Sequence, residues 1–209
     1  MSKTTGWRSL SAKRPEQSFS ALEYYESEEG RSHVEKNAVR KIQRGLTMRA
    51  LLLAKIPLHE KVLDAACGSG YSLELIKEAG YNAQGIDLSP RLVLLAKAKK
   101  LDARVGDLQK IPLPNAAFGG LISISALQWL LQGTEKEQKE KLAKCASEFW
   151  RVLKVGGRAA IQFYPESEEQ AMLAAKAFRA KGFKTVLHTE NPENARKRKV
   201  FILLEKQEN

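Results

Sequence analysis

The chain has 209 residues, of which 43% are hydrophobic and 28% are charged, so it suits one globular domain with a sizeable core and excludes wholesale disorder. No stretch approaches the apolar length of about 20 residues that a membrane-spanning helix needs, so we expect no membrane contact. The 35 Lys and Arg residues exceed the 24 Asp and Glu residues and give a net charge of +11. A basic surface favours polyanions, because each neutralised phosphate releases counterions, although it also serves solubility alone.

Cys67 and Cys145 are the only cysteines. Two cysteines build neither a disulfide framework nor a cysteine-based zinc site, so we expect no metal centre. Residues 1–14 also lack the apolar segment of a secretory signal. Together these features predict a protein of the reducing cytoplasm.

The chain changes character after its first residues. Residues 1–20 are basic and aperiodic, with no acid before Glu16, which predicts a flexible arm ahead of a single domain over residues 21–209. Between residues 35 and 54, apolar residues recur at helical spacing while basic residues from Lys36 to Arg49 fill the other faces. We expect an amphipathic helix whose basic stripe contacts phosphates; the alternative is a solvated basic face.

Strands and helices then alternate along the chain. Apolar runs predict strands over residues 61–66, 82–86, 103–106, 121–125, 158–163, 183–188 and 199–205. Capping signals, such as Thr134 with Glu137, start the helices between them. The alternation predicts an α/β, Rossmann-like fold with a mostly parallel sheet and helices on both faces, and the last two strands predict an antiparallel edge.

A glycine-containing turn, residues 66–70, follows the first predicted strand. Glycines there let the backbone approach a ligand closely at the carboxyl end of the strand. A dinucleotide-binding fold would carry a third glycine where Leu73 stands, and a P-loop would add a lysine, but the sequence has neither. The turn therefore favours a phosphate-free ligand that carries an amino acid and a nucleoside.

An acidic residue ends each of the first three predicted strands. Asp64 suits a ligand ammonium group, Asp87 suits a ribose diol, and Asp107 suits the amino hydrogens of adenine. Each acid alone is also explained as a helix cap or a turn residue. With the glycine turn, the three acids resemble the pattern of seven-stranded class I methyltransferases, which implies S-adenosyl-L-methionine as the cofactor.

Two later segments resemble a particular family. Residues 121–130, LISISALQWL, and residues 161–166, IQFYPE, are similar to signature segments of the eukaryotic small-subunit rRNA guanine-N7 methyltransferases and their archaeal relatives. The resemblance covers roughly residues 22–205. It implies methylation of guanine N7 in small-subunit ribosomal RNA during ribosome biogenesis. The eukaryotic members have a long basic C-terminal tail that is missing here, which indicates an archaeal-type member.

The resemblance implies catalytic roles for three residues. Trp129 and Tyr164 follow adjacent strands and suit stacking on the base, while Glu166 suits the N1 and N2 hydrogens of guanine. Alternatively, Trp129 is a core aromatic and Glu166 an acid of a first helical turn. Guanine N7 has a lone pair and no proton to lose, so the reaction needs alignment rather than a general base.

The expected cofactor-binding residues follow from the turn, the strand ends and the resemblance. Tyr25 and Arg49 flank the N-terminal helix, where Arg49 suits the methionine carboxylate or simply belongs to a solvated basic face. The full expected set is Tyr25, Arg49, Asp64, Ala66, Gly68, Ser69, Gly70, Asp87, Leu88, Asp107, Leu108 and Ser123.

The family resemblance also implies a protein partner. Eukaryotic members work with a small zinc-binding methyltransferase activator protein that adds to a sheet edge, and an apolar third strand at an edge needs such protection. Two other functions stay open. One is a tRNA or small-molecule methyltransferase of the same fold; the other is a ribosome-assembly factor whose RNA binding matters more than catalysis.

Overall fold

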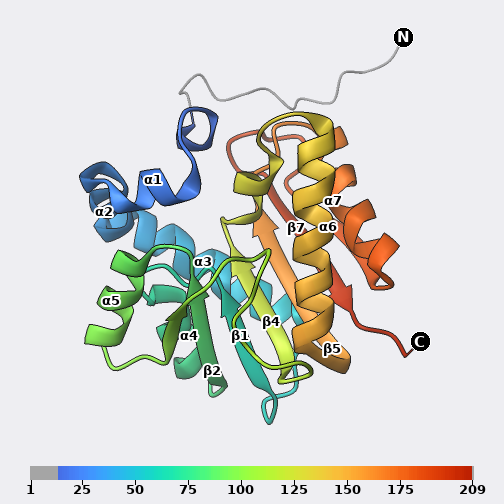
Figure 1. Cartoon of the computed structure of the whole chain (residues 1–209), viewed down its shortest axis with the longest axis horizontal. Coiled ribbons are helices and arrows are strands. Elements are labelled where there is room, and N and C mark those ends of the chain that lie inside the picture. Colours follow the sequence, from blue (N-terminus) through green and yellow to red (C-terminus); the bar gives the residue numbers. More distant parts are fainter. Residues whose placement is uncertain (1–13, 209) are drawn as a thin grey trace.

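The computed structural model of the chain describes residues 14–208 (Figure 1). Residues 1–13 of the predicted flexible arm lie outside the described residues. The remaining residues of that segment, 14–20, include the 3-10 turn η1, Pro15–Gln17, and the neighbouring Arg14 donates a hydrogen bond to the Tyr164 carbonyl. This part of the predicted arm is therefore attached to the domain.

Seven strands form one sheet in the order β3-β2-β1-β4-β5-β7-β6. They are β1 Lys61–Ala65, β2 Asn82–Asp87, β3 Ala103–Val105, β4 Phe118–Ile124, β5 Leu153–Phe163, β6 Lys184–Glu190 and β7 Lys199–Glu205. The first five pair in parallel, and β7 pairs antiparallel with both β5 and β6. The predicted antiparallel edge is confirmed, with β7 one position inside the edge strand β6.

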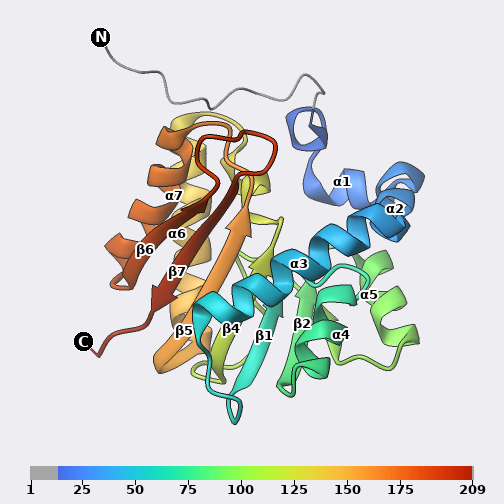
Figure 2. The ribbon, with the colours of Figure 1, turned by 180° about the vertical axis from the view of Figure 1, so that it is seen from behind.

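Helices cover both faces of the sheet (Figures 1 and 2). The helices are α1 Ala21–Glu26, α2 Glu28–Glu35, α3 Asn37–Ala54, α4 Tyr71–Glu78, α5 Pro90–Ala98, α6 Glu135–Val152 and α7 Glu168–Lys181, with a second 3-10 turn, η2, at Leu127–Leu131. One core cluster joins α6 and α7 to the sheet, and a second joins α3, α4 and α5 to its other face. This arrangement confirms the predicted fold class.

The sequence prediction missed the two helices before residue 35. Helix α1 is only six residues long, too short to show a helical period. Its capping box was present in the sequence, because the Ser20 hydroxyl accepts from the Glu23 N–H and the Glu23 carboxylate accepts from the Ser20 N–H. These two helices lie beyond the carboxyl ends of the strands and cover the site described below (Figure 1).

Strand β4 also differs from its prediction, since it begins at Phe118 and ends at Ile124. It includes Gly119 and Gly120, where side chains of Glu60 and Ile56 occupy the space that a Cβ would need. A Cβ on Gly120 would lie 2.6 Å from Ile56 Cδ1. Ser125, predicted as strand, has a φ of +57° and turns the chain sharply out of the sheet.

Membrane insertion has no support from the described helices, none of which combines the length and the apolar character that crossing a bilayer requires.

Candidate active site

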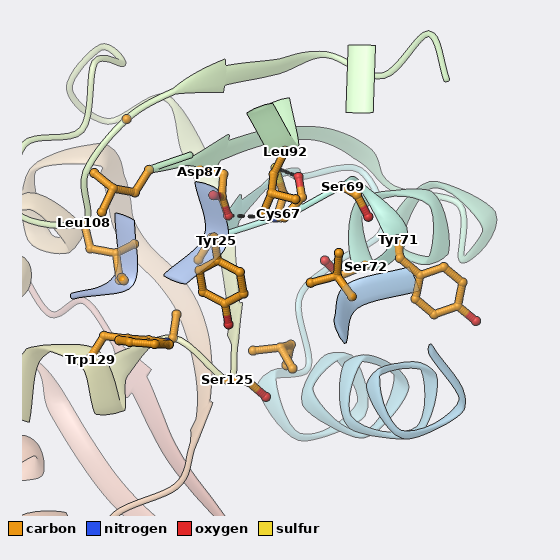
Figure 3. A pocket seen from close by; sticks show the side chains of 18 of the residues that line it. Tyr25, Cys67, Ser69, Tyr71, Ser72, Asp87, Leu92, Leu108, Ser125 and Trp129 are labelled. Atoms are coloured by element: carbon orange, nitrogen blue, oxygen red, sulfur yellow. Dashed lines mark hydrogen bonds between the residues drawn. The ribbon is translucent and has the colours of Figure 1, made fainter. Parts of the chain in front are cut away.

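One cavity lies at the carboxyl edge of the sheet, between the ends of β1, β2 and β4 and the covering helices α1 and α2. It is lined by Ala21, Tyr25, Val34, Gln43, Ala66, Cys67, Gly68, Ser69, Tyr71, Ser72, Asp87, Leu88, Leu92, Gly106, Asp107, Leu108, Ile124, Ser125, Ala126, Trp129 and Leu130. Eight of the expected cofactor residues are in this lining, as is Trp129. Figure 3 shows Tyr25 and Asp87 facing a shared space, with Trp129 and Leu108 on one side and Ser69 and Ser72 on the other.

The glycine turn is held against β2 by backbone hydrogen bonds. The N–H groups of Ala66 and Cys67 both donate to the Ile86 carbonyl, at 2.9 and 2.8 Å. Gly68 has a φ of +54°, and nothing lies within 4 Å of the position its Cβ would take. This open space at a left-handed residue lets a ligand approach the backbone, as the sequence predicted.

Asp87 is fixed at the end of β2 by two backbone donors. Its Oδ2 accepts from the Gly68 N–H at 2.8 Å, and its Oδ1 accepts from the Ser89 N–H at 3.0 Å. Burial raises the pKa of this carboxyl, and the two N–H groups oppose the rise. Each oxygen keeps unused acceptor capacity, so the carboxylate is oriented to accept hydrogen bonds from a diol.

Asp107 lines the cavity from the segment that follows β3. Its Oδ1 accepts from the Gln109 N–H at 2.8 Å, which closes a local turn and fixes the side chain. Gly106 and Leu108 line the cavity on either side of it. An acid held between two apolar contacts suits the flat, amino-bearing ring of adenine.

Asp64 is not among the residues that line the cavity, and its contact with a ligand ammonium group stays a prediction. The residue is 0% exposed, and its Oδ2 accepts from the Ser72 hydroxyl at 2.6 Å. Burial raises the pKa of Asp64 to about 7, while the Ser72 hydrogen bond lowers it and the charge of Asp87 raises it. Ser72 lines the cavity, so this hydrogen bond connects Asp64 to the cavity wall.

One oxygen of Asp64 bears on whether these residues fit the expected cofactor. Among the described residues, Asp64 Oδ1 is buried without a hydrogen-bond partner. A buried acceptor without a donor is costly, and a nearby ammonium group would stabilise its ionised form. The acids and the open glycine backbone together match a ligand with ammonium, diol and adenine groups, so the residues fit S-adenosyl-L-methionine.

Besides Asp64, three further expected cofactor residues lie outside the cavity lining. Gly70 has a φ of +87° and serves packing, because a Cβ there would lie 2.4 Å from Leu101 Cδ1. Ser123 is 0% exposed within β4, where the sheet covers it. Arg49 forms an ion pair with Glu190 on β6, and it lines a different groove between α3 and β6–β7. The structure therefore does not bring Arg49 to the cavity, and its contact with the methionine carboxylate stays a prediction.

Of the three expected catalytic residues, some line the cavity and others do not. Trp129 lines the cavity and packs against Tyr25, with ring centroids 5.5 Å apart and an interplanar angle of 60°. Tyr164 lies beside the lining, where burial raises the pKa of its hydroxyl and Ser125 lowers it. Glu166 is exposed, lies outside the lining, and accepts a hydrogen bond from Gln17. Only Trp129 thus faces the cavity directly.

Several lining residues were missing from the sequence prediction. Ser72 had a detectable signal, since it lies just after the glycine turn at the start of α4. Ser125 stands out only in three dimensions, where its hydroxyl bonds to Gln162 Oε1 at 3.0 Å. Ala21 and Val34 come from helices α1 and α2, which the prediction missed. Sequence patterns therefore did not predict the side of the cavity that α1 and α2 cover.

Comparison with known proteins agrees with this geometry. Residues 63–161 match a family model described as a methyltransferase domain. The chain is 34% identical over 200 residues to mouse 18S rRNA (guanine-N(7))-methyltransferase, covering 92% of this chain and 71% of the mouse protein. It is 30% identical over 190 residues to the 18S rRNA (guanine(1575)-N(7))-methyltransferase of Saccharomyces cerevisiae, covering 87% and 68%. The chain belongs to the family of these 18S rRNA (guanine-N(7))-methyltransferases.

Solved structures show the same fold in more distant proteins. A TehB-like SAM-dependent methyltransferase from Corynebacterium glutamicum is similar with a TM-score of 0.62 and 20% identity, covering 85% of this chain and all of that one. At this identity the similarity concerns the fold alone. The family therefore rests on the sequence relatives, and the site geometry is that of a class I methyltransferase domain.

Proposed function

We propose that this chain transfers the methyl group of S-adenosyl-L-methionine to N7 of a guanine in small-subunit ribosomal RNA. The observation that carries the proposal is one cavity lined by two chemically different groups of residues. Asp87, Asp107 and the Gly68 backbone form the first group, which we call the cofactor end, and the Tyr25–Trp129 pair forms the second, which we call the base end. The first end suits a nucleoside with an amino acid, and the second suits a flat base.

The reaction needs little acid–base catalysis from the protein. The cofactor supplies a sulfonium-activated methyl group, and guanine N7 offers a lone pair without a proton. Asp87 and Asp107 would hold the cofactor ends in place, while Tyr25 and Trp129 would hold the base plane. Burial raises the pKa of the Tyr25 hydroxyl, so it stays protonated and neutral beside the base. Catalysis then consists mainly of orientation and the exclusion of water.

The surface near the cavity supports an RNA substrate rather than a small molecule. Lys36 at the N-cap of α3 and Lys41 within this helix are exposed. Arg196 and Lys197 are exposed on the loop between β6 and β7. Figure 2 shows this loop at the carboxyl edge of the sheet, the edge that also holds the cavity. Cations on both sides of the opening suit a phosphate backbone that delivers its base between them.

The proposal is tested with methyl-labelled cofactor and small-subunit ribosomal RNA. We expect label at a guanine, and cleavage of the RNA at 7-methylguanine maps the position. Label confined to transfer RNA, or to a ring position other than N7, would replace the proposal with a related transferase.

A second candidate function is ribosome assembly by binding alone, which the exposed cations also support. The variant Asp87→Ala removes the diol acceptor while leaving the basic surface intact. If cells carrying this variant still assemble small subunits at the normal rate, binding is the essential role. If assembly stops with methylation, catalysis is essential.

A small zinc-binding activator protein is the proposed partner. Strand β3 has three residues and lies at an edge of the sheet, where β2 is its one partner among residues 14–208. Apolar side chains are exposed beside it, with Val105 on β3 at 48% and Leu94 on α5 at 67%. An added strand would pair with the free edge of β3 and cover this apolar surface.

The partner proposal has a matched control at the opposite edge of the sheet. Val105→Lys on β3 should weaken co-purification with the activator at least tenfold, whereas Val186→Lys on β6, where Val186 is 51% exposed, should leave it unchanged. Equal binding by both variants would exclude the β3 edge as the interface.

A further inference from the structure

The Tyr25 side chain belongs to the cavity wall and is held there by two neighbouring rings. Tyr25 is half-buried and lines the cavity from α1. Its ring packs on Tyr24, with ring centroids 5.1 Å apart at an interplanar angle of 72°, and on Trp129 with centroids 5.5 Å apart. Aromatic contacts on two sides fix the plane of the ring and therefore the position of its hydroxyl group.

The hydroxyl hydrogen of Tyr25 has no acceptor among the described residues. Tyr81, by contrast, donates its hydroxyl hydrogen to a backbone carbonyl at 2.9 Å. Figure 3 shows the Tyr25 hydroxyl directed into the space between Trp129 and Ser125. Burial and the charge of Asp87 raise the pKa of Tyr25, while Trp129 lowers it, so the hydroxyl keeps its hydrogen. This hydroxyl is therefore able to donate a hydrogen bond to a ligand in the cavity.

Trp129 brings a second hydrogen-bond donor to the base end of the cavity. Its Nε1–H group can only donate, and this buried nitrogen has no hydrogen-bond partner within residues 14–208. The rings of Trp129 and Tyr25 are in direct contact, so the two donors belong to one part of the cavity wall. Two donors without acceptors suit a ligand oxygen with two lone pairs better than an amino group, which needs acceptors.

We propose that the Tyr25 hydroxyl donates a hydrogen bond to O6 of the target guanine and thereby aligns N7 with the methyl group. This inference rests on the proposed function. O6 and N7 are neighbours on one edge of guanine, so a group that binds O6 must line the cavity in which the methyl group is transferred, as Tyr25 does. Adenine carries an amino group in place of O6, and a pair of donors binds an amino group poorly.

The proposed hydrogen bond acts on binding more than on the transition state. As N7 forms its bond to the methyl carbon, the bond from that carbon to sulfur breaks, and the positive charge passes from sulfur to the base. O6 then becomes a weaker acceptor, so the hydrogen bond is strongest before the transfer. Loss of the hydroxyl should therefore raise KM for the RNA more than it lowers kcat.

The test is a double-mutant cycle between the protein and the base. After the methylated guanine is mapped, the RNA is rebuilt by ligation with 2-aminopurine there, which keeps N7 and the 2-amino group but lacks O6 and the N1 hydrogen. Tyr25→Phe removes only the hydroxyl group. The guanine-to-2-aminopurine ratio of kcat/KM should fall about three- to tenfold in this variant, because only the guanine RNA loses a hydrogen bond. The affinity for S-adenosyl-L-homocysteine should be unchanged.

Tyr24→Phe is the matched control. It makes the same change on the adjacent residue, whose ring also packs on Trp129, at 5.8 Å between centroids. Tyr24 is not among the residues that line the cavity, so the ratio should keep its wild-type value. An unchanged ratio in Tyr25→Phe, or an equal fall in Tyr24→Phe, would overturn the inference. Weaker cofactor binding by Tyr25→Phe without a change in the ratio would also overturn it, since the hydroxyl would then bind the cofactor. A wild-type protein that labels no guanine would show instead that the proposed function has failed.

Discussion

The two ends of the cavity are built in different ways. At the cofactor end, Asp87 and the glycine turn come from adjacent strands and are fixed by backbone hydrogen bonds. At the base end, Tyr25 and Trp129 come from segments more than 100 residues apart and are held by ring packing. The cofactor end is therefore part of the sheet, whereas the base end is assembled on top of it.

This difference indicates which end of the cavity tolerates amino-acid substitutions. A site made of strand ends inherits the rigidity of the sheet, so one substitution removes one contact and leaves the remainder in place. A site assembled from side chains of distant segments loses several contacts together. Substitutions at the two ends should therefore separate cofactor affinity from base recognition.

The largest expected effect is on cofactor affinity. Asp87→Asn replaces the charged acceptor at the diol position and should weaken binding of S-adenosyl-L-homocysteine roughly 10- to 100-fold, because a hydrogen bond to a charged group is lost. Calorimetry measures this directly. Asp102→Asn, an exposed acid before β3, is the matched control and should bind normally. Equal affinity of the two variants would exclude Asp87 as the residue that binds the ribose diol.

The next effect should be confined to the base end. Trp129→Ala removes the ring that packs on Tyr25 and should slow RNA methylation about tenfold, since base stacking on an aromatic ring is worth ~1–3 kcal/mol. Trp129→Phe should recover most of the rate. Cofactor affinity, measured by the same calorimetry, should change less than the rate. A parallel loss of both would mean that the two ends are not separable.

A smaller effect concerns the pH dependence of stability. Asp64 has a folded pKa of about 7, raised above its ordinary value of 3.8, so the folded state binds a proton that the unfolded state releases. The free energy of unfolding should be highest below about pH 4 for this group and should fall as the pH rises to 7. Asp64→Asn removes the titrating proton, so denaturant melts of the variant should depend less on pH over this window. An unchanged pH profile would contradict the raised pKa.

The smallest effect is expected at Arg49, far from both ends. Its ion pair with Glu190 is partly exposed, so Arg49→Met should change stability by less than about 1 kcal/mol. Cofactor affinity should stay at the wild-type value in calorimetry. A tenfold loss of affinity would restore the methionine-carboxylate role that the structure argues against.

The sequence by itself determined the sheet and the cofactor end. Strand periodicity, the glycine turn and acids at three strand ends are local signals, and parallel strands bring their carboxyl ends to one edge, so Asp87 and Asp107 could be assigned to one site before any coordinates. The sequence patterns did not predict which of these side chains are buried. Asp64 and Ser123 have the right positions in the chain, but the packed sheet hides both from the cavity.

Only the tertiary structure decided the base end. Tyr25 meets Trp129 because α1 lies beyond the strand ends, and a contact between segments more than 100 residues apart leaves no local pattern in the sequence. The same is true of Arg49, whose partner Glu190 lies 141 positions away. Local hydrogen bonding and periodicity fix elements and their ends, whereas the contacts between distant segments are set by packing of the whole chain.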